Sequence, residues 1–109
     1  MRWRLMVILV RGPSMVPALR DGDAVLALRT GPGDRQVRPG QVVVARFRRQ
    51  PDLLVVKRVV RLDGDAWWIE GDNPLASADS RTYGGADVVG RVLLRYWPRP
   101  GRVPSSPVP

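Results

Sequence analysis

Short apolar runs, separated by turn-forming residues, restrict this chain to a β fold. The runs are rich in β-branched residues, and neither a long amphipathic helical pattern nor an internal repeat occurs. Glycine, proline and aspartate stand between the runs, as they do between short strands. We expect strands near Trp3–Val10, Ala24–Arg29, Gln41–Phe47, Leu53–Leu62, Ala66–Glu70 and Val88–Trp97. The pattern predicts an all-β protein, a single small β domain with little or no helix.

Turn signals refine this organisation. Asp63-Gly64-Asp65 predicts a tight hairpin that pairs Val55–Leu62 antiparallel with Trp67–Glu70. Further turns are expected at Gly31-Pro32-Gly33-Asp34 and Arg49-Gln50-Pro51-Asp52. Residues 98–109 carry five prolines, so we expect a folded domain over 1–97 and a disordered tail over 98–109 that does not pair in a sheet.

Composition excludes several kinds of site. The 109 residues include no cysteine and no histidine, which rules out disulfides, cysteine-based zinc sites and a Ser-His-Asp triad. The net charge is +8, but the arginines are scattered and lack interleaved aromatics, so we expect no nucleic-acid partner. The six apolar residues Leu5–Val10 are far fewer than the roughly twenty of a membrane span, and no small-residue cleavage site follows them. We therefore expect a soluble, cytoplasmic protein without an integral membrane segment.

Lys57 is the only lysine beside seventeen arginines, and it lies within the apolar run Leu53–Val60. Arginine does not release its proton in proteins, whereas a buried lysine can become neutral and act as a base. Strand alternation places Lys57 on the same face as Val55 and Val59. With no histidine or cysteine present, Lys57 is the natural candidate for acid–base chemistry. The alternative is a basic strand residue that happens to be lysine.

A candidate nucleophile occurs in the segment Arg11–Asp23. Ser14 follows a strand-like run and the pair Gly12-Pro13, and Pro17 disfavours helix in the residues before it. This predicts that Ser14 lies on a tight turn, where a nucleophile is accessible to a substrate. The alternative is an ordinary turn serine.

The polar segment Glu70–Gly84 is long for a connection between two strands. Asp79 and Arg81 are spaced for a local ion pair, and Ser77 or Ser80 is a candidate to orient a lysine amine. The alternative is a flexible surface loop.

Taken together and in order, these segments resemble the type I signal peptidase family of Ser-Lys proteases. The matching segments are Gly12-Pro13-Ser14-Met15-Val16-Pro17, Gly22-Asp23, Lys57-Arg58-Val59, Gly71-Asp72-Asn73 and Ser77-Ala78-Asp79-Ser80-Arg81. The resemblance implies that Ser14 is the nucleophile, that its backbone N–H contributes to an oxyanion hole, and that Lys57 is the general base. It implies that Ser77 orients the lysine and that neither metal nor cofactor is needed. The implied supporting residues are Met15 (lining the cleft), Pro17, Asp72, Asn73, Asp79, Ser80 and Arg81.

The chain departs from the family pattern in three respects. We expect neither the N-terminal membrane anchor nor the second β domain of many bacterial members, and Gly12 replaces a serine that donates to the oxyanion in some members. Within the family the chain is most similar to the nickel-type superoxide dismutase maturation proteases. That similarity implies a precursor-protein substrate, the nickel superoxide dismutase proenzyme, from which an N-terminal extension is removed.

Three alternatives remain open at this point. The first is a signal peptidase I-like protease that cleaves exported precursors, with its anchor supplied by a partner. The second is a basic β domain that binds nucleic acid. The third is a self-cleaving repressor-type protease, for which the sequence shows neither a cleavage loop nor a DNA-binding domain.

Overall fold

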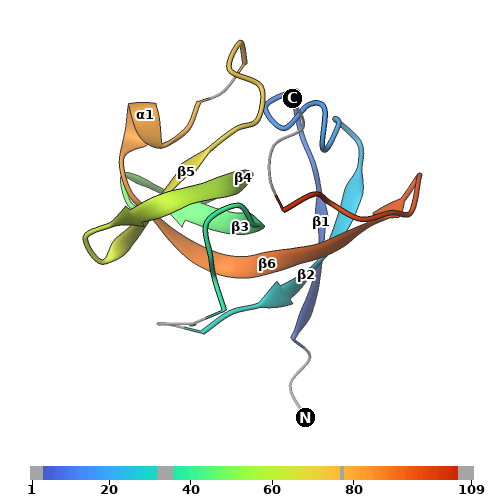
Figure 1. Ribbon diagram of the computed structural model, residues 1–109, viewed down its shortest axis with the longest axis horizontal. Helices are drawn as coiled ribbons and strands as arrows, with labels where there is room; N and C mark the ends of the chain where they lie inside the picture. Colours follow the sequence, from blue (N-terminus) through green and yellow to red (C-terminus); the bar gives the residue numbers. More distant parts are fainter. Residues whose placement is uncertain (1–3, 32–35, 77, 106–109) are drawn as a thin grey trace.

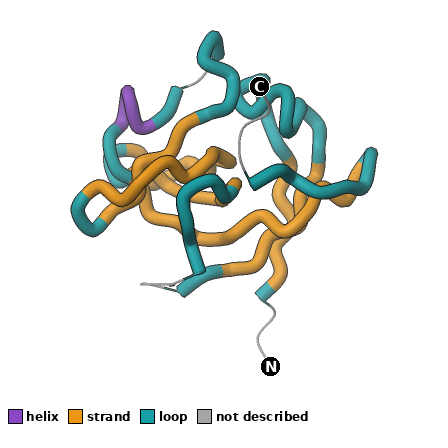
Figure 2. The backbone as a smooth tube through the Cα atoms, viewed as in Figure 1, coloured by secondary structure: helices purple, strands orange, loops and turns teal. Residues whose placement is uncertain are grey.

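The computed structural model describes residues 4–31, 36–76 and 78–105, and it confirms the all-β prediction. Figures 1 and 2 show that strands are the main regular structure, with one short helix at the periphery. The strands are β1 (Leu5–Leu9), β2 (Ala24–Arg29), β3 (Val42–Phe47), β4 (Gln50–Asp63), β5 (Ala66–Glu70) and β6 (Ala86–Trp97). The helix α1 spans Ser80–Tyr83.

All strand pairings are antiparallel, in the order β1-β2-β6-β3-β4-β5. β6 joins the two halves of the sheet because its first part pairs with β3 and its last part with β2. A further pairing of Trp67 with Ala86 brings β5 back to β6. The sheet therefore curls on itself, as Figure 1 shows, and places β4 beside the loops that follow β1 and β5.

The predicted hairpin at Gly64 is confirmed. β4 and β5 pair from Arg58↔Glu70 to Asp63↔Ala66, and Gly64 has a φ of +66°, which glycine adopts without steric cost. The turn predicted over Arg49–Asp52 was wrong, since β4 already begins at Gln50. Phe47 pairs with Gln50, so the turn occupies only the two residues between them. Most of the turn expected over 31–34 lies outside the described residues.

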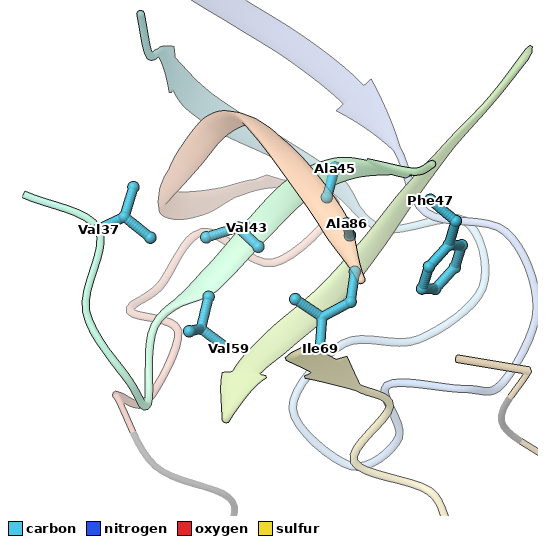
Figure 3. Packing of buried hydrophobic residues seen from close by; sticks show 7 residues of the cluster. All are labelled: Val37, Val43, Ala45, Phe47, Val59, Ile69 and Ala86. Atoms are coloured by element: carbon cyan, nitrogen blue, oxygen red, sulfur yellow. The ribbon is translucent and has the colours of Figure 1, made fainter. Parts of the chain in front are cut away.

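Two clusters of apolar side chains form the core. The first lies between β3, β4, β5 and β6 and is drawn in Figure 3; it contains Val37, Val43, Ala45, Phe47, Val59, Ile69 and Ala86. The second cluster contains Val10, Met15, Leu19, Val25 and Val42, with Ile8, Val56, Val92 and Val103 packed against it. β3 and β4 contribute residues to both, so these strands link the two clusters.

Described residues after β6 contact the domain instead of leaving it. Gly101 and Arg95 exchange backbone hydrogen bonds of 2.9 and 2.8 Å, and Val103 packs against the second core cluster. We had expected this tail not to pair, but the pairing residue is a glycine with a free choice of conformation and an N–H that proline lacks. The domain boundary at Trp97 stays a prediction.

Across the three described ranges, α1 is the one helix, and nothing there has the length and apolar character that crossing a bilayer as a helix requires.

Candidate active site

Ser14 lies on the turn that follows β1, as predicted. The N–H of Val16 donates to Pro13 O at 3.1 Å, and the N–H of Leu19 donates to Met15 O at 2.9 Å. Met15 and Leu19 are fully buried in the second core cluster, whereas Ser14 is half-buried. The turn is therefore fixed from beneath while the serine above it keeps access to solvent.

Lys57 lies on the apolar face that strand alternation indicated. It pairs with Val43 across the sheet, and Val55 and Val59 on either side pack in the first core cluster. Only 5% of the lysine is exposed. Its Nζ donates a hydrogen bond of 2.7 Å to Ser14 Oγ. Two residues that are 43 positions apart in the sequence are thus in direct contact.

Burial is the main reason that the pKa of Lys57 falls below its usual value of 10.5. The charge of Asp79 opposes this shift, and the charge of Arg81 adds to it. Removing water from an ammonium group disfavours its charged form, so the amine spends more time neutral than a surface lysine does. A neutral amine in contact with a hydroxyl is able to accept that hydroxyl's proton.

Asp79 and Arg81 form the predicted ion pair, with 2.7 Å between Arg81 Nη2 and Asp79 Oδ2. The Asp79 side chain is completely buried, which by itself would raise its pKa. The guanidinium of Arg81 and the backbone N–H groups of Gly71 and Arg81 outweigh burial, so the pKa of Asp79 is lowered overall. Asp79 therefore stays ionised close enough to Lys57 to influence its charge.

Asp72 and Asn73 connect this region to the turn of Ser14. The N–H of Asn73 donates to Ser14 O at 2.8 Å, and Asn73 Nδ2 donates to Pro13 O at 3.2 Å. Asp72 accepts from Arg58 Nε at 2.8 Å and from Nη2 at 2.7 Å, with both side chains at least 96% buried. Sequence reasoning gave Arg58 no role of its own. Its place inside an apolar strand run could have indicated a buried ion pair, because a buried charge needs a partner.

The remaining predicted site residues have other surroundings. The hydroxyl of Ser80 accepts a hydrogen bond of 2.8 Å from the N–H of Ile69, so it braces β5. Met15 is buried in the core beneath the turn, with only 1% of the residue exposed, and its role in lining the cleft stays a prediction. Pro17 is exposed on the turn. Ser77 lies outside the described residues, and its orienting role stays a prediction. Nowhere in the described ranges do three or more acidic side chains gather to hold a metal ion.

Comparison with known proteins identifies the family. The sequence pattern of the Peptidase S24-like family matches residues 3–93. The chain belongs to the Peptidase S24-like family. It is 35% identical to the mitochondrial ATP-independent inner membrane protease subunit 1a of Arabidopsis thaliana, over 82% of this chain and 68% of that protein. It is 32% identical to the mitochondrial inner membrane protease subunit 1 of Xenopus tropicalis, over 84% and 69% respectively. The human subunit 1 is 30% identical, with the same coverage.

These findings confirm the predicted signal-peptidase-like protease family. The relatives named above are subunits of a mitochondrial inner membrane protease, whereas the sequence resemblance pointed to nickel superoxide dismutase maturation. Membership of the family supports a peptidase.

Proposed function

We propose that this protein is a serine endopeptidase in which Ser14 is the nucleophile and Lys57 the general base. The observation that carries the proposal is the 2.7 Å contact between Lys57 Nζ and Ser14 Oγ on a buried lysine whose pKa is lowered. A serine hydroxyl is a weak nucleophile until a base removes its proton, and a neutral lysine amine supplies that base.

The reaction follows in two halves. Ser14 Oγ attacks the scissile carbonyl carbon while Lys57 Nζ takes the hydroxyl proton, which gives a tetrahedral oxyanion. The C–N bond then breaks, Lys57 returns the proton to the leaving amine, and Ser14 remains acylated. A water molecule attacks the acyl group, Lys57 accepts the water's proton and then gives it to Ser14 Oγ, and the new carboxyl terminus departs. The substrate, one water molecule and the side chains of Ser14 and Lys57 supply every atom and electron of the reaction.

Charge on the oxyanion is stabilised by preorganised donors. The family resemblance assigns the backbone N–H of Ser14 to this role. Gly12 offers no side-chain hydroxyl, and its own N–H donates to Asp21 Oδ1 at 2.8 Å. We therefore assign no side-chain donor to the oxyanion at position 12.

We propose that the substrate is a precursor protein that loses an N-terminal extension, and that the nickel superoxide dismutase proenzyme, processed in the cytoplasm, is such a precursor. This finer assignment rests on the resemblance of the motifs alone. The second candidate substrate is a precursor destined for export or for a membrane. The named relatives, which are proteases of the mitochondrial inner membrane, favour that candidate.

The test is incubation of the purified chain with each precursor, followed by mass determination of the products. We expect a single new terminus, and we expect none with Ser14→Ala, whose circular dichroism should match that of the unmodified chain. Cleavage by the folded Ser14→Ala variant would refute the nucleophile assignment. Cleavage of the exported precursor only would reject the dismutase and leave the Ser-Lys mechanism in place.

A further inference from the structure

The residues that follow β6 are connected to the turn of Ser14 through a chain of partly buried hydrogen bonds. Arg58 Nη1 donates to Pro104 O at 2.7 Å, while Nε and Nη2 of the same guanidinium hold Asp72. The next residue, Asn73, donates its N–H to Ser14 O at 2.8 Å. Because Arg58 is 3% exposed, its guanidinium depends on these partners and not on water.

A second, apolar connection runs beside the first. Val103 packs against the second core cluster, whose members Met15 and Leu19 form the floor of the Ser14 turn. Removing Val103 would open space next to that floor, and packed interiors respond to such space with shifts of neighbouring residues.

Arg95 adds a third connection. Its backbone pairs with Gly101. Figure 1 shows that the chain after β6 turns back across the molecule. Its side chain reaches the Ser14 turn, where Nη1 donates to Ala18 O at 3.3 Å. The same arginine therefore contacts both the returning chain and the turn.

The surface beneath residues 103–105 is shaped to receive them. Gly40 has a φ of +93°, and a Cβ atom at this position would collide with the backbone carbonyl oxygen of Ser105. Gly40 O also accepts from Arg58 Nη1 at 2.7 Å, so Gly40 and Pro104 share one donor group. Only glycine combines this backbone conformation with the space that the returning chain needs.

We propose that residues 101–105, here named the C-terminal strap, are a positioning element that holds the turn of Ser14 in register with Lys57. The catalytic part of this inference rests on the proposed function, whereas the attachment of the strap to the turn does not. A displacement of about 1 Å in a reacting group is enough to cost a hundredfold in rate. The strap therefore affects turnover although it contributes no group to the reaction.

The test compares a chain that ends at Arg102 with a chain that ends at Ser105, so that only residues 103–105 differ. For the chain ending at Arg102 we expect kcat to fall about 10- to 100-fold with KM little changed. Amide hydrogen exchange at Leu19 and Asn73 should become faster, while exchange at Ile69 of β5, in the first core cluster, should not. The pH midpoint of kcat/KM should move up toward that of an ordinary lysine, because a loosened turn admits water to Lys57.

Gly40→Ala provides a second test in the full-length chain. It should reproduce the faster exchange at Leu19 and the loss of kcat, because the new methyl group displaces Ser105. Gly64→Ala is the matched control, since Gly64 also has a positive φ but a Cβ there meets no atom within 4 Å. It should leave kcat unchanged and lower stability only.

The outcomes separate the two proposals. Unchanged exchange at Leu19 and Asn73 in the chain ending at Arg102 would overturn the strap, as would equal effects of Gly40→Ala and Gly64→Ala. If exchange became faster in the chain ending at Arg102 but the full-length chain cleaved no precursor, the attachment of the strap would be supported and the proposed function would be refuted.

Discussion

Replacing Lys57 by methionine should abolish activity and yet stabilise the fold at neutral pH. The proposed base is lost, for which we expect kcat/KM to fall about 10⁴-fold or more. Methionine is of similar length and carries no charge, so it suits a position that is 5% exposed. The variant no longer has to bury an ammonium group, which is the largest cause of the lowered pKa of Lys57.

The sign of the pH dependence follows from proton binding. Between the lowered pKa of Lys57 in the folded chain and 10.5 in the unfolded chain, the unfolded chain binds more protons. The free energy of unfolding of the wild type therefore rises with pH across this window, by at most about 1.4 kcal/mol for each pH unit. The cost of burying the charge is full below the folded pKa and has disappeared above 10.5.

The magnitude comes from two opposing contributions. Lys57→Met loses the hydrogen bond to Ser14, worth about 0.5–1.5 kcal/mol, at every pH. It gains about 1.4 kcal/mol for each tenfold lowering of the lysine's proton affinity at pH values below the folded pKa, and this gain falls to zero as the pH rises above 10.5. We thus expect the variant to be the more stable protein near pH 7 and the slightly less stable one near pH 11.

The assay is urea unfolding of both proteins at pH values from about 7 to 11, with the difference in unfolding free energy plotted against pH. Taking the difference removes the contributions of all other titrating groups. Lys57→Arg is the control, because its charge persists at every pH in this range; it should be inactive and less stable than Lys57→Met throughout. A difference that stays flat with pH would refute the desolvated-base reasoning, as would substantial activity in Lys57→Arg.

Further predictions concern the residues around the dyad. Asp72→Ala should cost about 3–5 kcal/mol in unfolding free energy because it leaves Arg58 charged and buried without a carboxylate. Asp65→Ala, which removes an exposed ion pair with Arg48, should cost far less. If urea unfolding gave similar losses of stability for Asp72→Ala and Asp65→Ala, the conclusion that Arg58 and Asp72 form a buried ion pair would be contradicted. Ser80→Ala should lower stability by about 1–3 kcal/mol with kcat nearly intact, because a buried N–H of β5 loses its acceptor. Ser77→Ala should slow kcat about tenfold without a change in stability. If kinetic and unfolding measurements instead showed that Ser80→Ala slows kcat and Ser77→Ala lowers stability, the roles of the two serines would have to be exchanged.

Much of the fold was predictable because it depends on local chemistry. The bounds of β2 and β5 and the hairpin at Gly64 follow from alternating apolar residues and turn residues that are neighbours in sequence. Ser14 and Lys57 were predictable for a different reason. Lys57 is a lone lysine in an apolar run, which is chemically unusual. Ser14 is a common kind of turn residue by itself, and it became a candidate because it stands in a series of segments whose order resembles the type I signal peptidase family.

Sequence alone thus determined the β architecture, the family and the two residues proposed for catalysis. Only the tertiary structure decided how those residues are held. The contact between Arg58 and Pro104 joins positions 46 residues apart, and Gly40 has a reason to be glycine only once the strap lies over it. No local pattern encodes such contacts, because each depends on where distant segments lie after the sheet has closed.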